Sequence, residues 1–101
     1  MGSYPRLRQE RLPEKLRTVR DALGLSQTEL LYRLGAEDLI AYNRISEFET
    51  GKREPPLVIL LLYARAANVW MDVLVDDELD LPARLPSANR HEGVRRRQSK
   101  S

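Results

Sequence analysis

The chain has 101 residues, enough for one domain, and its lack of cysteine excludes a disulfide framework and a thiolate metal site. Its net charge of +2 hides a separation: residues 1–20 hold six basic and two acidic residues, residues 81–101 hold six and one, and residues 21–80 hold five and twelve. Basic ends around an acidic domain favour a polyanionic partner, although such ends can also be simply solvated.

Two helices are expected in the first third of the chain, after a basic lead-in over residues 1–11. The first covers about residues 13–23, because apolar residues recur there at intervals of four, three and four, as Leu12, Leu16, Val19 and Leu23. The second begins after Ser26, which forms a capping box with Glu29, and ends at Gly35.

The stretch from 35 to 53 carries the strongest functional signal. A third helix is predicted over residues 40–50, with Ile45 and Phe48 on one buried face and polar residues on the others. Gly51 ends this helix, and Lys52 and Arg53 follow beside its exposed face. A short helix with one buried side, one polar side and cations at its end suits a DNA groove.

Beyond a proline pair, the pattern predicts a fourth helix over residues 57–67, capped by Asn68, and a short fifth helix over 70–75 with Trp70 packed beneath it. The fold class is therefore all-α, with five helices in one domain over residues 12–80. The remaining residues, 81–101, are expected to form a basic, flexible tail.

Five short motifs follow one another in order: L-R-T-V-R at 16–20, G-L-S-Q-T-E-L at 24–30, I-S-E-F-E-T-G-K-R at 45–53, prolines at 55–56, and N-V-W-M-D-V-L at 68–74. Together they resemble the Cro and phage-repressor type of helix-turn-helix regulator, also called the xenobiotic-response-element family. The resemblance implies that the third helix enters the major groove of double-stranded DNA and that dimers read two half-sites.

By position, the resemblance assigns base reading to Tyr42, Asn43 and Glu47. Asn can form two hydrogen bonds with adenine, and Glu can accept one from the cytosine amino group. The resemblance also assigns phosphate contacts to a second set of residues, namely Gln27, Arg44, Thr50, Lys52 and Arg53. Finally, it implies a structural ion pair between Arg20 and Glu49.

The chain departs from the family pattern at two acidic places. Residues 36–39 lengthen the turn before the third helix, and they bring Glu37 and Asp38 close to the expected path of a phosphate. Glu47 would repel a DNA backbone that it faced. Two interpretations follow. Either DNA binding by this domain is weak and is strengthened by the tails and by dimerisation, or the fold binds a protein partner instead.

The helix over 57–67 is expected to carry apolar residues on its core face and on its outer face. Family core positions are taken by Leu57, Leu60, Leu61, Ala64 and Ala67, whereas relatives carry polar residues at the places of Val58, Ile59 and Leu62. Spacings of three and four predict that these last three form one outward patch, which we expect to be a dimer or partner surface. The alternative is that the lead-in or the tail covers the patch.

No catalytic or cofactor motif is present, and G-x-x-x-x-G-K-[ST] is absent, so we expect neither an enzyme nor a cofactor. His91 is the one histidine, which predicts no metal site. The arginines at 95–97 are expected either to contact phosphates without sequence preference or to be part of a solvated tail. With no signal peptide and no membrane span, the leading hypothesis is a cytoplasmic, dimeric, sequence-specific transcriptional regulator, a repressor. The alternative is a protein-interaction module such as an antitoxin or adaptor.

Overall fold

The computed structural model describes residues 10–86, and within that range it contains five helices and no strand. In chain order these are α1 (Leu12–Leu23), α2 (Gln27–Leu34), α3 (Arg44–Glu49), α4 (Leu57–Ala67) and α5 (Met71–Val75). The prediction of an all-α, five-helix domain is confirmed. The predictions on His91 and on the arginines at 95–97 lie outside the described residues.

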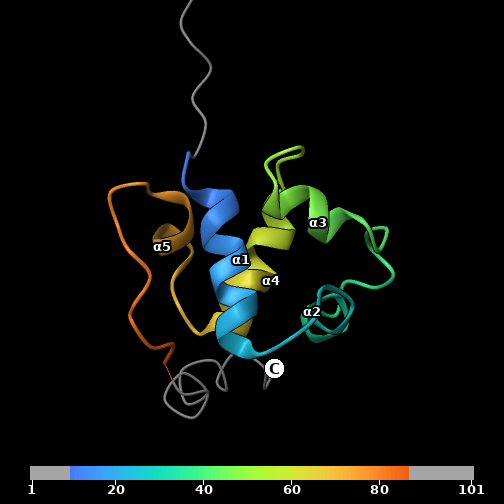
Figure 1. Ribbon diagram of the computed structural model, residues 1–101, viewed down its shortest axis with the longest axis horizontal. Coiled ribbons are helices and arrows are strands. Elements are labelled where there is room, and N and C mark those ends of the chain that lie inside the picture. Colours follow the sequence, from blue (N-terminus) through green and yellow to red (C-terminus); the bar gives the residue numbers. More distant parts are fainter. Residues whose placement is uncertain (1–9, 87–101) are drawn as a thin grey trace, which may run out of the picture.

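Helix α1 is the central element of the fold. It contacts α3, α4 and α5, while α2 packs against α3 and α4 (Figure 1). The side chains that fill the centre are fully buried and come from all five helices: Leu16, Val19, Leu30, Ile45, Phe48, Ile59, Tyr63 and Leu74. This one core fixes α2 and α3 together on one side of the molecule, with α5 on the other.

The helix ends follow local chemistry. Ser26 and Glu29 form the predicted capping box, in which the Ser26 hydroxyl accepts from the Glu29 N–H at 3.0 Å and the Glu29 carboxylate accepts from the Ser26 N–H at 2.8 Å. Gly51 follows α3 with a φ of 78°, in the left-handed region that a residue without a Cβ adopts at little cost. It turns the chain toward Pro13, whose Cγ would lie 3.5 Å from a Cβ at this position.

Helix α3 is shorter than the sequence suggested, and its expected start at residue 40 is wrong. The chain first closes a turn on the buried Ala36, whose carbonyl accepts from the N–H groups of Leu39 at 2.9 Å and Ile40 at 3.1 Å. A second turn over Tyr42 and Asn43 then leads into Arg44. Nine residues, 35–43, therefore separate α2 from α3. Residues 40–43, which were predicted to begin the helix, belong to this connection instead.

The predicted faces of α4 are wrong in part. Ile59 was expected on the outward patch, yet it is buried with 1% of its surface exposed. Leu57 and Leu61 were expected in the core, yet they are 72% and 36% exposed. The exposed apolar face of α4 consists of Leu57, Val58 and Leu61, and Leu62 is half-buried beside them. Arg65 is the single charged residue of α4, so the helix has too little periodicity for its orientation to be deduced.

Trp70 also differs from the prediction, because it is the N-cap residue of α5 and is 68% exposed. The buried positions nearby are Val69 before it and Leu74 after it. With its side chain largely at the surface, Trp70 does not support α5 from beneath.

The segment after α5 returns to the start of α1 and is held there by polar contacts. Lys15 is 2% exposed, and its ammonium group donates to the carbonyls of Val73, Asp76 and Leu79 at 2.8, 2.9 and 2.7 Å. Asp77 accepts from the N–H groups of Glu10 and Arg11, at 2.9 and 3.1 Å. We call residues 76–80 the acidic clasp.

The chain stays on the domain beyond residue 80, where the flexible tail was expected to begin. Leu81 and Leu85 are half-buried against the core, and the Asn68 amide donates to the Pro86 carbonyl at 3.4 Å. Among the helices described, none has both the length and the apolar character that a membrane span requires.

Candidate nucleic-acid interface

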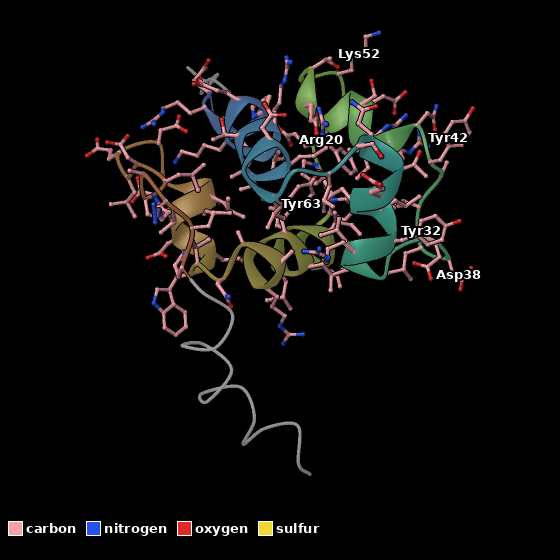
Figure 2. All side chains as sticks on the ribbon, turned by 60° about the horizontal axis from the view of Figure 1, so that its bottom comes forward. Arg20, Tyr32, Asp38, Tyr42, Lys52 and Tyr63 are labelled. Atoms are coloured by element: carbon pink, nitrogen blue, oxygen red, sulfur yellow. The ribbon has the colours of Figure 1, made fainter. Side chains whose placement is uncertain are left out.

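The three base-reading candidates surround the start of α3. Tyr42 is 74% exposed, and Asn43, the N-cap residue of α3, is also exposed. Glu47 follows Asn43 by four residues, one turn along the helix, so the two lie on the same face. Figure 2 shows Tyr42 projecting from the edge of the molecule, at some distance from the buried Tyr63. Ile45 and Phe48 hold the opposite face of α3 in the core.

Glu47 is joined to two of the phosphate-contact candidates. Its Oε1 atom accepts a hydrogen bond from Nη1 of Arg44 at 2.9 Å and another from Nε of Arg53 at 3.0 Å. The Glu47, Arg44 and Arg53 side chains are 26%, 33% and 52% exposed, so all three lie at the surface. We call Arg44, Glu47 and Arg53 the arginine–glutamate cluster.

The cluster removes the conflict that a lone carboxylate would create at this place. The hydrogen bonds from Arg53 and then Arg44 lower the pKa of the Glu47 carboxyl below its ordinary value, so the carboxylate stays charged at neutral pH. Two guanidinium groups around one carboxylate leave the cluster with one net positive charge. The repulsion expected between Glu47 and a DNA backbone is therefore compensated within the protein.

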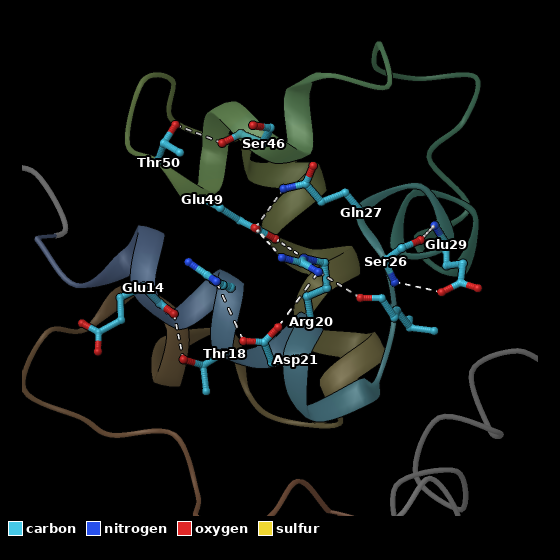
Figure 3. A network of polar contacts seen from close by, with 12 residues as sticks. Glu14, Thr18, Arg20, Asp21, Ser26, Gln27, Glu29, Ser46, Glu49 and Thr50 are labelled. Carbon is cyan, nitrogen blue, oxygen red and sulfur yellow. Dashed lines mark hydrogen bonds and ion pairs between the residues drawn. The ribbon is translucent and has the colours of Figure 1, made fainter.

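A second network fixes α3 to α1 and α2 (Figure 3). The Arg20 guanidinium donates to both carboxylate oxygens of Glu49, through Nε at 2.7 Å and Nη2 at 3.0 Å. The Arg20 and Glu49 side chains are only 14% and 4% exposed. The Gln27 amide donates to Glu49 Oε1 at 3.2 Å, and Arg20 Nη1 donates to the carbonyl of Leu25 at 3.0 Å. Gln27 thus contributes to the docking of α2 on α3, a contact that its assignment to phosphate did not include.

The remaining phosphate candidates lie after α3. The Thr50 hydroxyl donates to the Ser46 carbonyl at 3.0 Å, which closes the end of the helix. The backbone N–H groups of Lys52 and Arg53 donate to the Glu47 carbonyl, at 2.9 and 3.3 Å, so the basic pair is folded back against α3. Both side chains are exposed.

The turn before α3 is acidic as well as long. Glu37 and Asp38 are exposed, and Leu39 on the same turn is 59% exposed. Over residues 27–54, the unit that includes α2 and α3, there are four basic and six acidic residues. The basic groups close to the exposed face of α3 are Arg44, Lys52 and Arg53, so positive charge is local to that face.

Sequence reasoning found the members of this surface but missed two of its links. The Arg44–Glu47 pair could have been deduced, since oppositely charged residues three apart on a helix are neighbours. The contact of Glu47 with Arg53 could not, because it depends on how the chain folds back after Gly51. No group of residues suited to hold a metal ion occurs in the described part of the chain.

Comparison with known proteins gives one match. A helix-turn-helix family model matches residues 16–74, which extends from α1 to α5. Neither a search of curated proteins nor one of solved structures finds a match. The matched segment covers more than half of the chain and contains the whole network around α3. The chain therefore belongs to the helix-turn-helix family of the Cro and phage-repressor type, a family of DNA-binding regulatory domains rather than enzymes.

Proposed function

We propose that the protein is a sequence-specific, DNA-binding transcriptional regulator that places α3 in the major groove. The observation that carries this proposal is the exposed face of α3, on which Asn43 and Glu47 lie one turn apart with Tyr42 just before them. Helix-turn-helix proteins read base edges with residues at the start of this helix. Asn43 suits adenine, with which an amide can form two hydrogen bonds.

The phosphate contacts come from groups on either side of this face. Within residues 10–86, Arg44 and Arg53 have N–H donors beyond those bonded to Glu47, and Lys52 is exposed beside them. Gln27 begins α2 and Thr50 ends α3, so both lie at the margins of the same face. The Thr50 hydroxyl has one proton, so it must turn from the Ser46 carbonyl to donate to a phosphate. These five groups position the protein, while Tyr42, Asn43 and Glu47 select the sequence.

We further propose that the regulator acts as a homodimer, through the exposed apolar face of α4. This face consists of Leu57, Val58 and Leu61. It differs from the patch that the sequence predicted, because Ile59 is buried. A patch that packs against its own copy across a twofold axis suits a protein that reads two half-sites. A repressor acting on DNA in the cytoplasm is the simplest form of this proposal, because a dimer on an operator excludes other proteins.

A protein-interaction module is the second candidate function. It is favoured by the excess of acidic over basic residues in the unit of 27–54 and by the exposed Tyr32, Leu39 and Tyr42 around the long turn. Aromatic and apolar groups are enriched where proteins meet, whereas DNA surfaces are basic. An antitoxin or adaptor of this kind would bind its partner through the turn.

Binding to duplex DNA across a range of salt concentrations tests the first candidate. The preferred sequence is selected from a random duplex pool, and the affinity for it is compared between wild type and Asn43→Ala. We expect Asn43→Ala to lose about 1–3 kcal/mol of binding free energy on the selected site and to relax the preference at one base pair. The control is Thr18→Ala, because Thr18 is an exposed polar residue of α1, outside α2 and α3, and alanine is well accepted in a helix.

The two functions give opposite results. A regulator selects one sequence, and its affinity falls steeply as salt rises. A chain that enriches no sequence and binds duplex DNA no better at low salt would favour the interaction module instead.

A further inference from the structure

The starting point is the unequal use of the two carboxylate oxygens of Glu47. Oε1 accepts from both Arg44 and Arg53, whereas Oε2 has no hydrogen bond to any residue between 10 and 86. A carboxylate oxygen can accept two hydrogen bonds, so Oε2 keeps its full capacity. The two arginines hold the carboxylate from one side and leave its other oxygen available.

The arginines also keep most of their donors. Each guanidinium has five N–H groups, and Glu47 takes one from each, at Nη1 of Arg44 and at Nε of Arg53. The terminal nitrogens of Arg53 therefore stay able to bind a phosphate oxygen while Nε stays on Glu47. Binding to Glu47 and binding to phosphate can occur together.

The cluster is fixed by the backbone around it. Arg44 and Glu47 are three residues apart on α3, and the Glu47 carbonyl accepts from the N–H of Arg53 at 3.3 Å. Moving Arg53 would therefore disturb the side chain of Glu47 directly. Because Glu47 lies on the same face of α3 as Asn43, its open oxygen belongs to the surface that the proposed function directs at the bases.

We propose that the arginine–glutamate cluster is one reading unit, in which Oε2 of Glu47 accepts a hydrogen bond from an exocyclic amino group in the major groove while Arg44 and Arg53 hold the carboxylate and bind the flanking phosphates. This inference rests on the proposed DNA-binding function and names the base class that the site reads. Glu47 contacts the base, and the two arginines are positioning residues as well as phosphate contacts.

The chemistry of the acceptor defines that base class. An ionised carboxylate accepts hydrogen bonds and donates none. In the major groove, cytosine N4 and adenine N6 present donors, whereas guanine and thymine present acceptors at the corresponding place. The unit therefore selects an amino base, and it rejects a keto base at that position because two acceptors would face each other.

The experiment compares three single variants with wild type by selection from a random duplex pool and by salt titration on the selected site. Glu47→Ala removes the acceptor, Arg53→Gln removes a positioning cation, and Lys52→Gln is the matched control. Lys52 is basic, exposed and adjacent to Arg53, and among residues 10–86 the side-chain donors to the Glu47 carboxylate are Arg44 and Arg53. Thermal unfolding of each variant verifies that the domain is folded.

Wild type is expected to enrich an amino base at one position, with a loss of about 5- to 100-fold in affinity when a keto base replaces it. Glu47→Ala should lose that preference. Arg53→Gln should weaken the same preference and also reduce the salt slope by about 0.9. Lys52→Gln should reduce the salt slope by a similar amount and leave the preference intact.

A double variant separates coupling from addition. If Arg53 acts partly through Glu47, Glu47→Ala combined with Arg53→Gln loses less affinity for the selected site than the product of the two single losses. Two results together overturn the reading unit. Arg53→Gln would keep the same base preference as Lys52→Gln, and the double variant would lose affinity by the product of the two single losses. A wild-type protein that enriches no sequence overturns the proposed function itself, so the two failures are distinguishable.

Discussion

Tyr63 is the largest fully buried side chain, and its hydroxyl forms no hydrogen bond with any residue between 10 and 86. A buried hydroxyl without a partner costs free energy, so Tyr63→Phe should leave the unfolding free energy at neutral pH unchanged or raise it by about 1 kcal/mol. Burial also raises the pKa of Tyr63 above its ordinary value of 10.0, because it disfavours the charged phenolate.

This shift makes the stability depend on alkaline pH. The folded chain keeps the Tyr63 proton while the unfolded chain loses it near pH 10, so the contribution to stability is full below that pH and falls as the pH rises further. The loss is about 1.4 kcal/mol per pH unit. Urea unfolding of wild type and Tyr63→Phe from pH 8 to 11 measures it. Tyr32→Phe, at an exposed position on α2, is the control, and an equal alkaline loss in all three proteins would contradict the prediction.

The ion pair between Arg20 and Glu49 permits a second prediction at the scale of single residues. Arg20→Met leaves the nearly buried Glu49 carboxylate with the Gln27 amide as its one remaining side-chain donor among residues 10–86. Breaking a fully buried pair from one side costs about 3–5 kcal/mol and breaking a partly exposed pair costs less, so the unfolding free energy should fall by an amount below that range. Arg17→Met on the exposed face of α1 is the control, since its contact with Asp21 is long at 3.8 Å. Equal unfolding midpoints in the two variants would remove the pair from the account of stability.

At the scale of elements, the acidic clasp gives α1 a beginning that its own residues do not supply. Arg11 is the N-cap residue of α1 and its side chain forms no capping hydrogen bond; the Asp77 carboxylate accepts from the backbone there instead. Asp77→Ala should therefore lower the unfolding free energy by about 1 kcal/mol, as the loss of a cap does. Urea unfolding checks this against Glu78→Ala, an exposed neighbour. A Glu78→Ala protein that loses as much stability as Asp77→Ala would contradict it.

Lys15 shows why the clasp and α1 behave as one element. Its ammonium group donates to one carbonyl of α5 and to two carbonyls of the clasp. Burial lowers the pKa of Lys15, and the charge of Arg11 lowers it further. The negative charges of Asp77, Asp80 and Asp76 oppose this shift by raising the pKa. Three hydrogen bonds to carbonyls and the surrounding carboxylates make the burial of this lysine tolerable.

At the scale of the whole molecule, the proposed dimer depends on a face that no other described element covers. Leu57→Glu places a charge at the most exposed leucine of α4, and the first turn of a helix accepts a carboxylate, so the domain should remain folded. We expect the variant to sediment as a monomer and to bind the selected DNA site more weakly, because one subunit holds one half-site.

Leu39→Glu makes the same chemical change at a leucine that is 59% exposed on the turn before α3, and it should remain dimeric. Wild-type protein that sediments as a monomer both alone and on a duplex with two half-sites would overturn the dimer. A Leu57→Glu protein that stays dimeric would place the interface elsewhere.

Much of the fold was determined by the sequence itself. Helix ends depend on groups within four residues of each other, so Ser26 with Glu29, Gly35 and Asn68 marked them correctly. Amphipathic spacing located the buried face of α1, because this helix has a polar side. Five motifs in order were enough to identify the family, since each corresponds to a local structure with its own residue requirements.

Only the tertiary structure decided what depends on distant parts of the chain. Helix α4 has Arg65 as its single charged residue, so its apolar residues show little periodicity. Its contacts with α1, α2 and α5 bury Ile59 and leave Leu57 exposed. The turns that close on Ala36 shortened α3. Lys15 meets its carbonyls across 58 to 64 residues, and Glu47 meets Arg53 only after the chain reverses at Gly51. Such contacts leave no periodic trace in the sequence, because their partners are brought together by the packing of the whole domain.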